Sequence, residues 1–238
     1  MEKVEQNFMR KVLKAHSKTP IEALYLELGI IPLRFRLMER RILYFHDVMN
    51  RPDEEITKQV VILQKKEGIE GDFYLLVKTD LERLEMDGEF VGVSKECVKS
   101  ELERKVKISA FEFLIDKAKN HSKVRDNMYR DCNGAKHIHN SIFTPDIINI
   151  LFKFRTHTYL VKNNFRNNYI NTNITCPLCE KADDTQEHMF ECSEIKQLCG
   201  ELNCTYSDVF TEEDDKLLNV GKTLKRLDKI RNELLDKE

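Results

Sequence analysis

The chain has 238 residues and a formal net charge of −2, with 41% hydrophobic and 34% charged residues. This length allows a buried core, and the composition is typical of a soluble, helix-rich protein. The absence of tryptophan and the low numbers of glycine (8) and proline (5) argue against a β-sandwich or a β-barrel. Because the net charge is near zero, any nucleic-acid-binding surface must be local.

The N-terminal sequence MEKVEQNFMRK lacks the apolar core of a signal peptide, and no run approaches eighteen apolar residues. We therefore expect no membrane partner and an intracellular protein, nuclear or cytoplasmic. In such a compartment the seven cysteines are expected to be free thiols and metal ligands rather than disulfides.

Helical periodicity covers the first predicted region, residues 1–92. Helices are expected over residues 1–16, 21–28, 33–50, 54–66 and 72–86. Thr19-Pro20 is typical of a helix start, in which threonine caps the helix and proline occupies its first turn. Gly29 is expected to end the second helix in the left-handed conformation.

Three further regions follow. Residues 93–170 are predicted to hold a long helix capped by Ser94 and a second helix that starts at Thr144-Pro145 and runs to about Val161. Residues 171–200 form a predicted zinc knuckle, and 201–238 an acidic linker with a C-terminal helix that docks on the body or on a protein partner. The expected fold class is all-α, a helical bundle-like body followed by the knuckle and this helix.

Four candidate metal ligands lie close together: Cys176, Cys179, His188 and Cys192, in the pattern Cys-x2-Cys-x8-His-x3-Cys. The first pair brackets a two-residue turn, so both sulfurs can face one ion. His188 and Cys192 are four residues apart, so a helix starting near Thr185 places them on one face. Three thiolates and one imidazole suit a structural zinc site with no position left for substrate. The alternative is that the four residues are unrelated.

No acidic residue occurs from Ile147 through Cys179, whereas twelve acids face two bases between Glu180 and Asp215. Lysines and arginines that alternate with aromatic residues are typical of surfaces that bind single strands. The acid-free span is therefore expected to contact nucleic acid, unless its aromatic residues are core. Its basic and aromatic residues are Lys153, Arg155, Lys162, Arg166, Phe152, Phe154, Tyr159, Phe165 and Tyr169.

Two histidines, His137 and His139, have no carboxylate or cysteine at a suitable spacing and are expected to be surface residues rather than a metal pair. Cys199 and Cys204 are expected to be packed free thiols.

Several blocks carry a resemblance to a known family. KTPIEALYLELGIIPLRFRLMERRILYFHDVMN, SKVRDNMY, FRTHTYLVKNNFRNNYINTNITCPLC and DDTQEHMFEC resemble, in the same order, the region after the polymerase palm in non-LTR (LINE-type) retrotransposon reverse transcriptases. The resemblance implies a helical region, thumb-distal-like over 1–92, that holds nucleic acid and ends in a zinc knuckle. By position it makes Arg155, Asn164, Phe165 and Arg166 candidate contacts, with Arg40 and Arg41 as weaker candidates.

The departures from that family exclude its catalysis. A polymerase needs paired aspartates that follow an aromatic residue, but Asp183-Asp184 follows Lys181-Ala182 within the knuckle. The residues after Cys192 are too few for a nuclease domain. We therefore expect a non-catalytic, zinc-containing module that binds RNA or single-stranded DNA. The alternative is a structural or protein-interaction protein with a structural zinc site.

Overall fold

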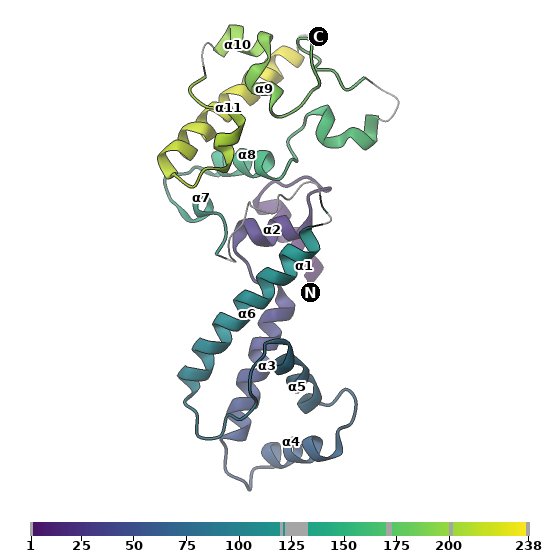
Figure 1. Ribbon diagram of the computed structural model, residues 1–238, viewed down its shortest axis with the longest axis vertical. Coiled ribbons are helices and arrows are strands. Elements are labelled where there is room, and N and C mark those ends of the chain that lie inside the picture. The colour runs from purple at the N-terminus through teal and green to yellow at the C-terminus, as the bar shows by residue number, and fades with distance from the viewer. Residues whose placement is uncertain (1, 120, 122–132, 170–172, 200–201, 237–238) are drawn as a thin grey trace. The chain divides into compact units, whose positions relative to one another are not determined.

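The computed structural model describes residues 2–119, 121, 133–169, 173–199 and 202–236 (Figure 1). Within these ranges the secondary structure is helical, with only one isolated antiparallel bridge, between Thr175 and Asp183. The expectation of a mainly α-helical fold is confirmed for this part of the chain. None of the described helices combines the length and the hydropathy that a membrane span requires.

Contacts divide the chain into two compact units. The first unit comprises Ile30–Asp116 together with Glu2, and the second comprises Lys3–Gly29 together with the chain from Lys117 onward. The second unit therefore combines an N-terminal segment with the C-terminal half of the sequence.

The first unit contains α3 (Leu33–Met49), α4 (Ile56–Glu67), α5 (Phe73–Arg83) and most of α6 (Lys95–Ala118). The Ser94 hydroxyl accepts a hydrogen bond from the Cys97 backbone N–H at 3.3 Å, as expected of an N-terminal cap. Helix α6 buries an apolar residue at every fourth position, which forms one continuous stripe. This stripe consists of Val98, Leu102, Val106, Ala110, Leu114 and Ala118.

The second unit begins with α1 (Glu2–Val12), which ends earlier than predicted, and α2 (Ile21–Leu28). Gly29 ends α2 in the left-handed conformation with φ 64°, as predicted. A Cβ atom on Gly29 would lie 2.6 Å from the backbone carbonyl carbon of Asn133, and one on Gly134 would lie 2.7 Å from the Gly29 nitrogen. Two glycines thus allow the end of α2 to touch the loop before α7 (Lys136–His139).

Helices α8 (Pro145–Arg155) and α11 (Asp214–Leu235) pack against each other in the second unit. Gly221 permits their close approach, because a Cβ atom there would lie 2.4 Å from Cγ2 of Ile147. Helix α8 ends at Arg155 rather than near Val161, since the Thr156 hydroxyl bonds back to the Phe152 carbonyl at 2.8 Å and His157 takes a left-handed conformation, φ 49°. The short helices η1 (Lys162–Tyr169), α9 (His188–Glu191), α10 (Ser193–Cys199) and η2 (Tyr206–Phe210) complete the unit.

Candidate metal centre

The first two candidate ligands, Cys176 and Cys179, lie on a tight turn. The Glu180 N–H donates to the Cys176 carbonyl at 3.0 Å, and the Cys176 N–H donates to the Ala182 carbonyl at 2.7 Å. Glu180 takes a left-handed conformation, with φ 55°. These bonds fold the Cys-Pro-Leu-Cys segment back on itself, so both sulfurs lie on the same side of the turn.

The other two candidate ligands lie at the ends of α9: His188 is its first residue, and Cys192 directly follows its last residue, Glu191. The Thr185 hydroxyl accepts a hydrogen bond from the His188 N–H at 2.9 Å, and the Cys192 N–H donates to the His188 carbonyl at 2.7 Å. The spacing of four residues thus places the imidazole and the thiol on one side of the helix. A helical turn is present as predicted, but it begins at His188 rather than near Thr185.

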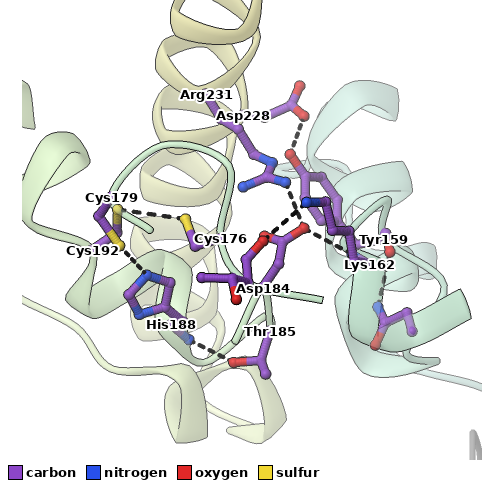
Figure 2. A network of polar contacts seen from close by, with 12 residues as sticks. Tyr159, Lys162, Cys176, Cys179, Asp184, Thr185, His188, Cys192, Asp228 and Arg231 are labelled. Carbon is purple, nitrogen blue, oxygen red and sulfur yellow. Dashed lines mark hydrogen bonds and ion pairs between the residues drawn. The ribbon is translucent and has the colours of Figure 1, made fainter. Parts of the chain in front are cut away.

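The four ligand atoms converge, all within 4.8 Å of one another (Figure 2). The Sγ atoms of Cys176 and Cys192 are 4.0 Å apart, and the Sγ of Cys179 lies 3.1 Å from Nε2 of His188. A tetrahedral zinc ion with Zn–S bonds of about 2.3 Å needs sulfurs about 3.8 Å apart. The spacing and the donor types therefore fit a metal ion held by three cysteines and one histidine.

The surroundings shift the pKa values of Cys192 and Cys179 in opposite directions. Burial raises the pKa of the Cys192 thiol to about 11, so a nearby cation is needed to hold it as a thiolate at neutral pH. At Cys179 burial acts in the raising direction, but hydrogen bonds from the backbone of Lys181 and Ala182 and from the other thiols bring the pKa below its usual value. An ion held by all four residues would cross-link the chain and would have no open position for a substrate.

Asp184, in the same loop, ties the candidate metal centre to the rest of the second unit. Its Oδ2 accepts hydrogen bonds from Nη2 of Arg231 at 2.9 Å and from the Lys162 backbone N–H at 2.8 Å (Figure 2). Asp184 is 1% exposed and Arg231 is 4% exposed. Lys162 also donates through Nζ to the Thr175 carbonyl at 3.0 Å. The loop is thereby joined to both α11 and η1.

Three more polar contacts surround this loop. The buried Gln186 amide donates to the Phe154 carbonyl at 2.8 Å and accepts from Asn164. The Tyr159 hydroxyl donates to Asp228 of α11 at 2.6 Å, and burial, followed by this carboxylate, raises the pKa of Tyr159. The candidate metal loop is thus fixed to α8, η1 and α11 by buried side chains.

The pairing of Asp184 with Arg231 was not predicted from the sequence. In the sequence, Asp184 stands out only as a member of the Asp183-Asp184 pair. A usable signal exists for Arg231, because it continues the apolar pattern of Leu217, Val220, Leu224 and Leu227, and a charge on the buried face of a helix requires a partner.

Arg155 is not a surface residue, and its predicted role as a nucleic-acid contact is wrong. It is 6% exposed, and its guanidinium donates to Oε1 of Glu27 at 3.0 Å and to the Val209 carbonyl at 3.2 Å. Phe165 is also buried, at 8% exposure, with its ring 4.6 Å from that of His16. Phe165 therefore offers no free face for base stacking.

The other residues predicted to contact nucleic acid differ in their exposure and in their partners. Lys153, Lys162 and Asn164 are half-buried, and the last two bond to the protein itself. The side chain of Arg166 lies outside the described residues. Arg41 pairs with Asp80 at 2.7 Å, whereas Arg40 is exposed. Among the described side chains, the acid-free span therefore does not form the exposed basic and aromatic surface that was predicted.

The aromatic residues Phe152, Phe154 and Tyr159 are core residues, as the alternative interpretation of the acid-free span predicts. His137 is 1% exposed rather than at the surface, and its Nε2 lies 3.4 Å from Oε1 of Glu27. Cys199 and Cys204 are buried free thiols, as expected.

Comparisons with protein-family models, with curated proteins and with solved structures give no match to this chain.

Proposed function

We propose that this chain is a non-catalytic helical module that is stabilised by a structural zinc centre and binds RNA or single-stranded DNA. The convergence of Cys176, Cys179, His188 and Cys192 within 4.8 Å carries the zinc part of the proposal, and the family resemblance supports the nucleic-acid part. The order and spacing of these residues agree with the zinc knuckle that the family resemblance implies.

Zinc is favoured over other metals by the donor set. Thiolates and imidazole are soft or borderline ligands, and a tetrahedral set of three sulfurs and one nitrogen is typical of structural zinc. Such a centre supplies a cross-link between the turn at Cys176 and helix α9. The hydrogen bonds of Asp184 extend this cross-link to α11.

A non-catalytic role is supported by the use of the two acids in the metal loop. Asp184 is committed to Arg231 and to the Lys162 backbone, while Asp183 is exposed and takes part in the bridge with Thr175. A polymerase centre needs two carboxylates that share metal ions. Asp183 and Asp184 have separate structural surroundings instead.

The proposed nucleic-acid binding is tested with the whole chain and a labelled single-stranded oligonucleotide, using fluorescence anisotropy between 50 and 200 mM salt. Four phosphate contacts predict a slope of about −3 for log affinity against log salt concentration. The absence of binding at 50 mM salt, or an affinity that does not change with salt, would contradict the proposed function.

A second candidate function is a structural or protein-interaction role. Its support is the internal use of Arg155 and Arg41, together with the exposed Ile56, Val60 and Leu63, which form one stripe along α4. In this case the chain should keep a stoichiometric protein partner through nuclease treatment and high salt, and it should bind no oligonucleotide.

A further inference from the structure

Four basic side chains gather on the solvent-facing side of α11. Lys222, Lys225, Arg226 and Lys229 are all exposed, and we refer to them as the α11 basic strip. Their spacing places them on one face of the helix, over a length of about 10 Å. The opposite face of α11 is buried and carries Leu217, Val220, Leu224 and Leu227.

Between Lys222 and Lys229, α11 itself carries no exposed acidic residue. Between Leu218 and Asn232 the sequence has a single acidic residue, Asp228, which is half-buried and accepts the Tyr159 hydrogen bond at 2.6 Å. At the end of the strip, Lys229 lies 3.7 Å from Glu233 in an exposed pair, which contributes little because water screens it.

A fifth cation, Lys14, lies beside the strip. Oxygen atoms of Asp146 are 3.2 Å from Nζ of Lys225 and 3.8 Å from Nζ of Lys14, and all three side chains are more than half exposed. Two lysines from distant parts of the sequence thus share one carboxylate. The positive charge here exceeds the negative charge, although the chain as a whole has a net charge of −2.

The strip is also held in a fixed position. Arg231, less than one turn beyond Lys229, is anchored to Asp184 of the candidate metal loop at 2.9 Å, and Gly221 packs directly on Ile147 of α8. A rigid array of cations loses less conformational entropy on binding a polyanion than flexible side chains on a mobile segment do.

We propose that the α11 basic strip, with Lys14, binds the phosphate backbone of a single-stranded nucleic acid without sequence preference. This inference rests on the proposed function and locates its contact surface. Lysine and arginine contacts to phosphates position a strand but do not read its bases. The sequence of α11 has no aromatic residue that a base could stack on, so sequence selection is not expected from this helix.

The chemistry of the exposed face favours nucleic acid over an anionic bilayer. A helix that lies in a membrane interface needs large apolar side chains next to its basic residues. None of the large hydrophobic residues found exposed in the described part of the chain belongs to α11. The strip can therefore contact phosphates but has nothing to insert into acyl chains.

The test replaces Lys222, Lys225, Arg226 and Lys229 together by alanine, which preserves the helix. A matched control replaces four exposed lysines of the first unit, Lys65, Lys66, Lys78 and Lys99, and so removes the same charge elsewhere. Binding of a labelled poly-dT oligonucleotide is measured between 50 and 200 mM salt, and circular dichroism verifies folding.

The wild-type affinity is expected to fall about 50-fold over this salt range. The strip variant should lose most of the binding and most of the salt dependence, whereas the control should retain both. Equal binding by the strip variant and the wild type, or equal loss in both variants, would overturn the location of the surface. No binding by the wild-type chain would instead overturn the proposed function itself.

Asp146→Asn supplies a second variant whose effect cannot result from misfolding. Removal of this carboxylate releases Lys225 and Lys14 to phosphates, so oligonucleotide affinity at 50 mM salt should rise several-fold. An unchanged or lower affinity counts against the proposal. The last experiment measures binding to vesicles that contain phosphatidylserine. If the chain binds these vesicles through the α11 basic strip but does not bind poly-dT, the proposal that the ligand is a nucleic acid is wrong.

Discussion

The carboxylate of Asp184, in the middle of the candidate metal loop, lies 2.9 Å from the guanidinium of Arg231 on the C-terminal helix, and both side chains are buried. This ion pair connects residues 47 positions apart in the sequence. Because Asp184 lies between the second and third candidate ligands, it links the order of the metal loop to the position of α11. The pair thus joins the proposed metal centre to the proposed binding surface.

Disruption of this pair should be costly when only one partner is removed. Arg231→Met leaves the Asp184 carboxylate buried without its counter-charge, and we expect a loss of about 3–5 kcal/mol in the free energy of unfolding. The double variant Asp184→Asn, Arg231→Met should recover part of that loss, as measured by urea denaturation. Additive losses in the double variant would show that the two side chains do not interact.

A substitution of Arg155 tests whether this residue stabilises the fold through Glu27 instead of contacting nucleic acid. Arg155→Met leaves Glu27 buried without its main partner, so the free energy of unfolding should fall by several kcal/mol. Under conditions in which the variant is still folded, the salt dependence of its oligonucleotide binding should match that of the wild type. A smaller slope in the folded variant would restore Arg155 as a phosphate contact.

His137 should make the stability depend on pH. Burial lowers the pKa of its imidazole from 6.5 to about 4, so the folded state binds fewer protons than the unfolded state between these pH values. The stability is therefore complete above about pH 6.5 and declines as the pH falls toward 4, by about 3 kcal/mol in total.

The comparison variant for this effect is His137→Gln, which keeps a polar group beside Glu27 but does not titrate. Urea denaturation at several pH values should give a flatter profile for His137→Gln than for the wild type between pH 6.5 and 4. Parallel profiles for the two proteins would mean that His137 does not titrate abnormally.

The contact between Gly29 and Gly134 predicts a difference among glycine substitutions. Gly29→Ala and Gly134→Ala place a Cβ against backbone atoms at 2.6 and 2.7 Å and also occupy a left-handed conformation. Gly68→Ala meets only the conformational cost of about 1 kcal/mol, because nothing lies within 4 Å of its added Cβ. Denaturation should rank Gly68→Ala as clearly the mildest, and equal losses would refute the close contact.

Local signals in the sequence located most helices. The cap at Ser94, the end of α2 at Gly29 and the helix between His188 and Cys192 follow from single-residue stereochemistry, which does not depend on the rest of the fold. The end of α8 was misplaced because the hydroxyl of Thr156 bonds to the Phe152 carbonyl, a choice that the apolar periodicity through Val161 does not reveal.

The composition of the acid-free span did not show which of its charged side chains are buried. An acid-free span predicts a basic surface only if its positive side chains face solvent, and Arg155 is instead neutralised by Glu27, 128 positions earlier. The four basic residues of α11 were overlooked for the opposite reason. A count of charges hides this basic face behind the nearby acids of the linker and the first turn, although the spacing of Leu217, Val220, Leu224 and Leu227 marks the side of the helix opposite to it.

The central claim, that Cys176, Cys179, His188 and Cys192 hold one zinc ion, is tested most directly by native mass spectrometry of the purified chain. We expect one zinc per wild-type chain and per Cys97→Ser chain, since Cys97 is an exposed thiol outside the centre. Cys179→Ser should lose the metal at the same zinc concentration. A wild-type chain without zinc after purification and zinc supplementation, or a Cys179→Ser chain that keeps it fully, would contradict the account.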